Sequence, residues 1–381
     1  MRLRLCFVVD AGTDVRMVEG LAARTELRIV ARRIRGGREI SQAPRDAAFE
    51  IEVGPDSHAA FAAFAARRVF ARRRSTDIVL VQGYGPTAAA VNVAGRVAGL
   101  AVRMLVCSPV EAYYRARRRP DSRRRFRRSE YAAIVGLARL NARLGQGYVV
   151  LSPYLASVIR SHGTRRPVDI AAVYGVDPAV FHPTAEPKQA IRRRLGLPEH
   201  ETILFFSSRV APEKDAATVL EAAALLSRHG MPVRVLNLSG GHRDLVELAR
   251  GMGVVDRVIA ADAVVPFEPL ADYYRASDVC VQASREEGLG FSPLEALACG
   301  VPVVASDVGG LADTIRDGDT GWTVRVGDAE GLARAVREIV ADPAEAAART
   351  ARGRALVDRA YARDVAFDAL LACLRRDGTT P

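Results

Sequence analysis

Two glutamates, Glu287 and Glu295, lie eight positions apart around a short glycine-rich loop. Between them, Ser292 and Pro293 predict the start of a helix, because serine caps helix N-termini and proline suits the first turn. The free N–H groups of such a turn bind phosphate, and carboxylates accept hydrogen bonds from paired hydroxyls. The pair has two interpretations: solvated charges of an ordinary loop and helix, or two carboxylates that hold one ligand.

Two basic residues, Arg209 and Lys214, follow the apolar run 202–208. A guanidinium and an ammonium at the end of a strand suit a diphosphate, which arginine can bind in a fork. Taken alone, the two would be interpreted as a surface pair. Lys214, however, is one of only two lysines, with Lys188, in a chain that otherwise uses arginine.

Apolar, β-branched runs alternate with helical patterns rich in alanine and leucine in both halves of the chain. This alternation predicts an α/β protein with doubly wound parallel sheets. Strands are expected at 5–10, 27–33, 49–53, 77–83, 102–108 and 147–152, and then at 202–208, 233–239, 257–261, 278–284 and 302–306. Helices are expected at 58–73, 87–100, 215–230, 243–253, 270–277, 293–300, 310–318, 330–342 and 364–376.

A stretch rich in proline and polar residues, 173–189, interrupts the alternation and predicts a linker between domains. At about 150 residues per domain, the length of 381 residues also favours two domains. We expect domains at 1–183 and 184–355, and a C-terminal helix at 356–381 that packs back toward the first domain. Ligands of open α/β sheets bind beyond the carboxyl ends of the strands, where both candidate pairs fall.

The segment 278–310 resembles the E-x7-E signature of retaining glycosyltransferases with the GT-B fold, especially family 4. The family's consensus sequence is Glu-Gly-Phe-Gly, then four residues, then Glu-Ala-Met-Ala-x-Gly-x-Pro-Val-Val-Ala. This chain has EGLG from Glu287 and EALACGVPVVA from Glu295. The run SSRVAPEKD is similar to the family's Gly-Arg-Leu-x-x-Glu-Lys-Gly, with Ser208 and Asp215 in the two glycine positions.

The resemblance implies a GT-B fold, with two Rossmann-like domains facing across a cleft, the first binding the acceptor and the second a nucleotide sugar. It implies that Glu287 lies against the donor sugar and that Glu295 holds the ribose hydroxyls. Arg209 and Lys214 would stabilise the leaving diphosphate, so that no metal and no cofactor is required. The other implied donor contacts are Gly12, Gly288, Leu289, Gly290 and Phe291, with the base held by backbone around 263–267.

The first half departs from the family in ways that concern the acceptor. Gly12 stands alone where relatives often have two glycines, and the segment 107–111 lacks the histidine that many relatives carry there. Glu111 could orient or deprotonate an acceptor hydroxyl, or cap a helix or pair with nearby arginines. Tyr113 and Arg115 are the further acceptor candidates.

The net charge is +11, and 53 of the 55 basic residues are arginine. The arginine-rich run from Arg115 to Arg128 is either a solvated loop and helix face, or a patch for anionic lipid headgroups or phosphorylated acceptors. A nucleic acid is the less favoured partner. Five scattered cysteines and six histidines show no metal-binding spacing, which predicts buried thiols in a reducing compartment.

The first residues, MRLRLCFVVD, contain too short an apolar run for a signal peptide and predict a buried strand. No apolar run reaches the length of a membrane span, so we expect a cytoplasmic protein with peripheral contact at the inner face of the membrane through the arginine run.

The sequence thus predicts a retaining, metal-independent hexosyltransferase that uses a nucleotide diphosphate sugar, with UDP slightly favoured. A hydroxyl acceptor in cell-envelope polysaccharide or glycolipid synthesis, including a lipid-linked one, is the first expectation. The alternatives are a transferase of a soluble secondary metabolite and a non-catalytic GT-B scaffold that binds nucleotide. The base, sugar, acceptor, linkage and oligomeric state are not specified by the sequence.

Overall fold

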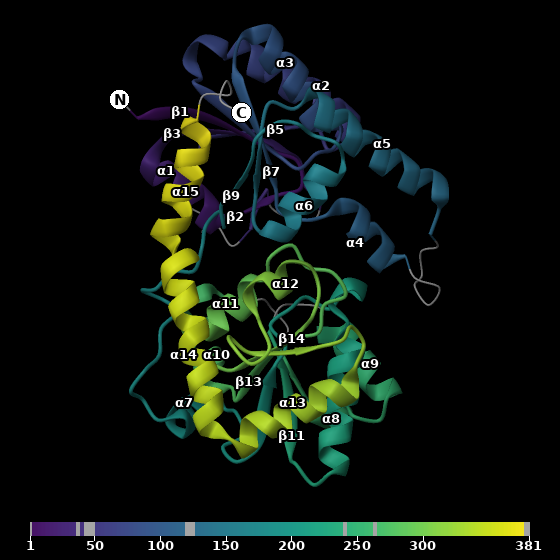
Figure 1. Cartoon of the computed structure of the whole chain (residues 1–381), viewed down its shortest axis with the longest axis vertical. Helices are drawn as coiled ribbons and strands as arrows, with labels where there is room; N and C mark the ends of the chain where they lie inside the picture. Colours follow the sequence, from purple (N-terminus) through teal and green to yellow (C-terminus); the bar gives the residue numbers. More distant parts are fainter. Residues whose placement is uncertain are drawn as a thin grey trace. The chain divides into compact units, whose positions relative to one another are not determined.

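The computed structural model describes residues 2–35, 39–41, 50–118, 126–238, 242–261 and 265–376. Contacts divide the chain into two compact units (Figure 1), each with its own parallel sheet. Unit 1 holds the described residues of 1–111, 126–174 and 366–376, and unit 2 holds those of 112–118 and 175–365. The domain boundaries expected at 183/184 and 355/356 remain predictions.

The sheet of unit 1 is parallel throughout, with the order β5-β3-β1-β6-β7-β8-β9. Its strands are β1 (Leu3–Val9), β3 (Thr25–Arg32), β5 (Ile51–Gly54), β6 (Ile78–Gln82), β7 (Ala101–Val106), β8 (Tyr148–Val150) and β9 (Val168–Ile170). A separate pair joins β2 (Thr13–Asp14) and β4 (Ile40–Ser41). The helices that begin in this unit are α1 (Val15–Arg24), α2 (His58–Ala71), α3 (Pro86–Ala98), α4 (Val110–Arg117), α5 (Arg128–Leu144) and α6 (Pro153–Ser161), with the 3-10 turn η1 (Arg73–Ser75).

The last helix, α15 (Arg363–Arg375), is fixed to unit 1 by a buried arginine. Arg103 of β7 is 1% exposed and donates to the carbonyls of Cys373 (3.5 Å) and Arg376 (2.5 Å). These carbonyls lie at the C-terminal end of α15, where a cation also complements the helix dipole. Residue 103 therefore stabilises the end of a helix far away in the sequence.

The sheet of unit 2 is also parallel, with the order β12-β11-β10-β13-β14-β15. Its strands are β10 (Thr202–Phe205), β11 (Val233–Asn237), β12 (Val258–Ala260), β13 (Val279–Gln282), β14 (Val303–Ser306) and β15 (Trp322–Val324). Its helices are α7 (Lys188–Leu195), α8 (Ala216–Arg228), α9 (His242–Gly251), α10 (Phe267–Ala276), α11 (Phe291–Ala298), α12 (Gly309–Thr314), α13 (Ala329–Ala341) and α14 (Pro343–Ala360), with 3-10 turns η2 (Pro212–Lys214) and η3 (Val255–Arg257).

Helices cover both faces of this second sheet (Figure 1). On one face, apolar side chains of α8, α9 and α13 form a core with β10, β11, β13 and β14. On the other face, the ring of Tyr274 in α10 lies 4.8 Å from that of Phe205 in β10. Trp322 of β15 is 4% exposed and lies under the guanidinium of Arg349.

The predicted α/β class with doubly wound parallel sheets is confirmed, and each expected strand and helix is present. The stretch 173–187 forms no helix or strand, as expected of a linker. The 18-residue helix α14 was not predicted. All five cysteines are free thiols, and burial raises the pKa of Cys6 to about 11.

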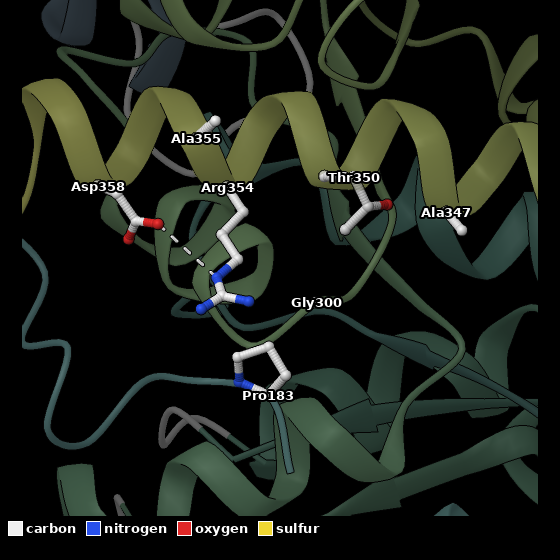
Figure 2. A pocket seen from close by; sticks show the side chains of 8 residues that line it. Pro183, Gly300, Ala347, Thr350, Arg354, Ala355 and Asp358 are labelled. Carbon is white, nitrogen blue, oxygen red and sulfur yellow. Dashed lines mark ion pairs between the residues drawn. The ribbon is translucent and has the colours of Figure 1, made fainter. Parts of the chain in front are cut away.

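A surface pocket of unit 2 lies between α14 and the residues Pro183 and Gly300 (Figure 2). Its described lining includes Ala347, Thr350, Arg354 and Asp358 but none of the candidate site residues. Among the described parts of the chain, no helix combines the length and apolar composition needed to cross a membrane.

Candidate active site

The candidate residues of unit 2 gather where the order of its strands reverses. The sheet extends from β10 through β11 to β12 on one side, and from β13 through β14 to β15 on the other. At such a point the loops that leave the two central strands diverge, and ligands of open α/β sheets bind there. Arg209 and Lys214 follow β10, and Glu287 follows β13.

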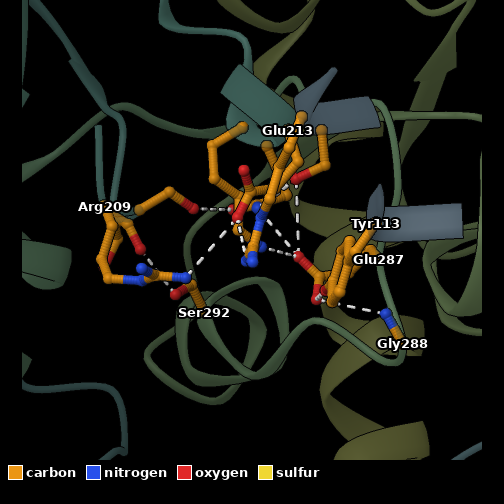
Figure 3. A network of polar contacts seen from close by, with 12 residues as sticks. Tyr113, Arg209, Glu213, Glu287, Gly288 and Ser292 are labelled. Carbon is orange, nitrogen blue, oxygen red and sulfur yellow. Dashed lines mark hydrogen bonds and ion pairs between the residues drawn. The ribbon is translucent and has the colours of Figure 1, made fainter. Parts of the chain in front are cut away.

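Glu287 is 9% exposed, and its carboxylate is contacted from several sides (Figure 3). The Lys214 ammonium donates to its Oε2 atom, where the Nε2 of Gln282 also lies at 3.3 Å. Ser284 Oγ lies 3.4 Å from the same oxygen, and the Gly288 N–H donates to Oε1 at 3.2 Å. The predicted site therefore joins Lys214 and Glu287 directly.

Asp215, next to Lys214, has the backbone conformation that favours glycine. Its φ is 53°, and it precedes the first residue of α8. Aspartate tolerates this left-handed region better than most residues. Its carboxylate also accepts from Thr218 Oγ1 at 2.8 Å and pairs with Arg285 at 2.6 Å. These contacts explain how Asp215 can occupy the position where the family motif has glycine.

Glu213 is a buried carboxylate that the sequence analysis did not single out. It is 1% exposed, and its Oε1 atom accepts from Arg117 Nη2 at 2.7 Å, with Arg209 Nη2 at 3.6 Å (Figure 3). Burial raises the pKa of Glu213, but the hydrogen bond from Arg117 and the charges of both arginines outweigh it, so its pKa lies below the usual value. The available signal was the glutamate of the Glu-Lys pair in the family motif.

Glu295 is buried in α11, one turn from the helix start as predicted, and is 4% exposed. The Tyr274 hydroxyl lies 3.0 Å from its Oε2 and 2.9 Å from Ser207 Oγ. Burial and the neighbouring Glu295 carboxylate raise the pKa of Tyr274 well above its usual value, so the phenol stays protonated. It can therefore donate a hydrogen bond to the carboxylate.

The start of α11 differs from the expectation. The helix begins at Phe291 with Gly290 as its N-cap, and Ser292 does not cap it. The Ser292 hydroxyl instead donates to the Ser207 carbonyl at 2.7 Å. Gly290 has φ 91° and ψ 78°, and a Cβ there would lie 2.5 Å from Leu311. A glycine conformation, rather than a serine cap, therefore turns the loop into the helix.

The Glu287 loop also rests on α12. The Gly310 N–H donates to the Glu287 carbonyl at 2.9 Å, and an added Cβ at Gly310 would lie 2.2 Å from the Gly288 carbonyl oxygen. Leu289 is 1% exposed. The backbone of this loop is thus fixed by close packing.

Two adjacent serines after β10 link the surroundings of the two glutamates. Ser207 contacts Tyr274 and Ser292 on the Glu295 side. Ser208 Oγ donates to Gln282 Oε1 at 2.9 Å on the Glu287 side. Ser208 replaces the glycine of the family motif, and this hydrogen bond satisfies its hydroxyl.

Tyr113 and Arg115, predicted as acceptor residues, lie on α4 in the part grouped with unit 2. The Tyr113 hydroxyl donates to Glu287 Oε1 at 3.3 Å. Burial and nearby carboxylates raise the pKa of Tyr113, so it acts as a donor. Arg115 is exposed. Residues 119–125 of the arginine run, and 262–264 of the segment expected to hold the base, lie outside the described residues.

Gly12 and Glu111 belong to unit 1. Gly12 follows β1 near the reversal of that sheet between β1 and β6, and its carbonyl accepts from Gln82 Nε2 at 2.9 Å. Glu111 contacts the Tyr84 hydroxyl at 2.5 Å and His162 Nε2 at 2.8 Å. Burial raises the pKa of Glu111, but these two hydrogen bonds outweigh it and lower the pKa below its usual value.

Through its contact with Glu111, His162 lies beside the segment 107–111, which has no histidine of its own. The His162 side chain is 9% exposed and comes from the end of α6, more than fifty residues along the chain. Spacing in the sequence gives no signal for this pair. Among the described residues, no group of three or more His, Cys, Asp or Glu side chains is arranged to hold a metal ion.

Comparisons with known proteins agree with this geometry in the second half of the chain. Residues 187–355 match the family model described as glycosyl transferases group 1. The chain is 37% identical over 202 residues to D-inositol 3-phosphate glycosyltransferase of Rhodococcus erythropolis, covering 47% of this chain and 46% of that protein. The enzyme of the same name from Gordonia bronchialis is 34% identical over 229 residues, covering 55% and 50%. The chain thus spans about half the length of the curated relatives it matches.

Solved structures agree over nearly the whole chain. Sucrose-phosphate synthase from Thermosynechococcus elongatus superposes with a TM-score of 0.77 at 21% identity, over 98% of both chains. Anabaena HepE, in complex with UDP and glucose, gives 0.75 at 16% identity, over 98% and 99%. These likenesses establish the GT-B fold class.

Proposed function

We propose that this chain is a glycosyltransferase that moves a sugar from a nucleotide diphosphate sugar to an acceptor hydroxyl. One observation carries the proposal: at the β10/β13 reversal, the Glu287 carboxylate contacts the Lys214 ammonium beside the start of α11. The match of residues 187–355 to the glycosyl transferases group 1 model supports it independently.

The chemistry separates charge. Breaking the bond between sugar and diphosphate leaves negative charge on the diphosphate and positive charge on the anomeric carbon. The negative charge on the diphosphate would be stabilised by Arg209, Lys214 and the N-terminus of α11. Preorganised groups of this kind supply much of an enzyme's rate acceleration. Glu287 would stabilise or orient the sugar. Since the protein supplies these charges itself, we propose transfer without a metal, and with retention at the anomeric carbon.

The roles on either side of the reacting bond follow from the same placement. Glu295 would hold the ribose hydroxyls, and backbone from Gly288 to Phe291 would contact sugar and diphosphate. UDP is the favoured nucleotide, which HepE binds in its solved complex. Glu111, which contacts the His162 imidazole at 2.8 Å, would orient the acceptor hydroxyl.

For the acceptor, we propose a hydroxyl compound of cell-envelope polysaccharide or glycolipid synthesis. The arginine run would bring the protein to an anionic membrane surface or hold a phosphorylated acceptor. Of its described members, Arg127 pairs with Glu130 at 3.6 Å and Arg117 with Glu213.

Transfer with labelled donors tests the proposal. UDP-glucose, GDP-mannose and ADP-glucose would be offered with D-inositol 3-phosphate or a lipid-linked sugar, in the presence of EDTA. We expect one donor to give a product whose anomeric configuration, read by NMR, matches that of the donor. An inverted product, or equal transfer by a Glu287→Gln variant, would contradict the proposed mechanism.

A further inference from the structure

We propose that Arg117 of α4 is a positioning residue of the diphosphate site. Its guanidinium neutralises the buried Glu213, so that Arg209 and Lys214 present a net positive charge to the donor diphosphate. This inference rests on the proposed function, but it concerns a residue that no family motif includes. Arg117 lies in the arginine run that the sequence analysis interpreted as a solvated face or a lipid patch.

The geometry places both arginines on one carboxylate oxygen. Arg117 Nη2 lies 2.7 Å from Glu213 Oε1, and Arg209 Nη2 lies 3.6 Å from the same atom. Glu213 is 1% exposed, and its other oxygen, Oε2, has no hydrogen-bond partner among the described residues. A buried carboxylate that loses its closest cation is strongly destabilising, so it will draw on the next cation available. That cation is Arg209.

The charges at the site then depend on Arg117. Three cations, Arg117, Arg209 and Lys214, face two carboxylates, Glu213 and Glu287. The formal charges of these five side chains therefore sum to +1. Without Arg117 the sum is zero, and Arg209 becomes the nearest partner of Glu213. A diphosphate carries several negative charges, so the arrangement with Arg117 attracts it more strongly than the arrangement without it.

The same face of α4 also reaches the other carboxylate. Tyr113 and Arg117 are four residues apart, a spacing that places side chains together on a helix surface. The Arg117 guanidinium lies 5.3 Å from the Tyr113 ring centre, and the Tyr113 hydroxyl donates to Glu287. One helix face thus holds both Glu213 and Glu287 in place.

Rescue by a second substitution tests the inference. Calorimetry would measure binding of UDP, or of whichever nucleoside diphosphate the wild type binds, to Arg117→Gln, Glu213→Gln and the double variant. We expect Arg117→Gln to weaken binding about tenfold, as expected for a lost charge at this range. The double variant should bind within about threefold of the wild type, since removing both charges frees Arg209 again.

Three outcomes would overturn the inference. Arg117→Gln could bind as tightly as the wild type, or the double variant could bind as weakly as Arg117→Gln, which would indicate that Arg117 contacts the nucleotide itself. Arg117→Lys, which keeps the charge, could also fail to restore most of the affinity in a folded protein. If the wild type binds no nucleoside diphosphate, the proposed function fails instead, and the two failures are distinguishable.

A matched control variant distinguishes the loss of a charge at the site from the loss of a charge elsewhere on the protein. Arg316 pairs with Asp319 at 3.3 Å, and its side chain is 52% exposed against 48% for Arg117. Arg316→Gln removes one charge from an exposed pair in the same unit. We expect its nucleotide affinity to match the wild type, and an equal loss in this variant would count against a specific role for Arg117.

Discussion

The two glutamates of the candidate site have different surroundings, and these suggest different roles. Glu287 lies among polar groups and contacts a lysine, whereas Glu295 is buried beside Tyr274 and Ser207. The contact with Lys214 fixes the Glu287 carboxylate in place, which suits the proposed stabilisation of an oxocarbenium-like centre. A buried carboxylate held by a tyrosine suits a fixed contact with a ligand that carries hydroxyl groups.

We therefore expect substitutions of the two glutamates to have separate effects. Glu287→Gln should lower the rate of transfer about a hundredfold or more, while nucleotide affinity is kept or increased because the substitution frees Lys214. Glu295→Gln should weaken nucleotide binding about tenfold, the loss expected for hydrogen bonds to a charged group. Steady-state kinetics together with calorimetry measure both. Loss of binding in Glu287→Gln with an unchanged rate at saturation would reverse the assignment.

Asp215 supplies a prediction about backbone conformation. A non-glycine residue in the left-handed region costs about 1–2 kcal/mol, part of which the contacts of Asp215 with Thr218 and Arg285 offset. Asp215→Ala keeps the conformational cost and loses the contacts, whereas Asp215→Gly removes both. We expect urea unfolding to show the alanine variant about 1 kcal/mol less stable than the glycine variant. Equal stabilities would be inconsistent with strain at this position.

Gly310 supplies a test of how closely the Glu287 loop is packed. Alanine there would press on the Gly288 carbonyl and displace the backbone that carries Glu287, so we expect Gly310→Ala to lower transfer at least tenfold. Gly251, at the end of α9, has open space around an added Cβ and makes Gly251→Ala the control. Equal activity in the two variants would show that the loop adapts.

At the scale of single residues, the sequence predicted which residue types form the candidate site better than it predicted which of them are in contact. The motif residues Lys214 and Glu287 were expected in one site, and they are in contact. Tyr113 was an acceptor candidate, but its contact with Glu287 spans 174 residues and that of Arg117 with Glu213 spans 96, so neither contact could be predicted from a local pattern. Ser292 was expected as a cap on composition alone, and the conformation of Gly290 decided otherwise.

At the scale of elements, α7 is tied to the central strands of unit 2 by one carboxylate. Asp278, just before β13, pairs with Lys188 at 2.8 Å and with Arg192 at 2.6 Å, and it accepts from the Ile203 N–H at 2.8 Å. Burial raises the pKa of Asp278, but Lys188, the Ile203 N–H and Arg192 outweigh it and lower its pKa below the usual value.

The lowered pKa of Asp278 predicts how the stability of the folded protein depends on pH. The folded protein favours the ionised form, so Asp278 contributes stability above the ordinary aspartate pKa of about 3.9, and that stability is lost as pH falls through the lower folded value. We expect Asp278→Asn to be about 2 kcal/mol less stable at pH 7, with the difference shrinking below about pH 4. Denaturant unfolding at pH 7, 5 and 3 measures it. A difference independent of pH would exclude the ionic explanation.

One element that the sequence did not predict, α14, shows why helices can be missed. Its sequence, PAEAAARTARGRALVDRA, has many small and charged residues and few large apolar ones. Gly353 in its middle lowers helix propensity, yet it allows close contact, because an added Cβ would lie 2.6 Å from Leu297 of α11. Packing between the two helices, rather than a strong apolar stripe, stabilises this element.

At the scale of the whole molecule, the strand–helix alternation was sufficient to predict two parallel sheets. It also predicted that the candidate residues follow the carboxyl ends of strands, and Arg209 does follow β10 as Glu287 follows β13. The alternation gave no indication of the residue that fixes α15 to unit 1, because Arg103 makes that connection across 270 residues of sequence. Long-range contacts of this kind leave no local pattern.

The central claim is that the reversal between β10 and β13 binds a nucleoside diphosphate. A thermal-unfolding panel with UDP, GDP, ADP, CDP and dTDP, in EDTA and again in magnesium, tests it most directly. A nucleotide at 100 times its dissociation constant stabilises a protein by about 2.7 kcal/mol, which such a panel detects. We predict that one nucleotide, UDP first, raises the unfolding temperature in EDTA, and that Arg209→Gln reduces this increase. No increase with any nucleotide in either condition would contradict the account.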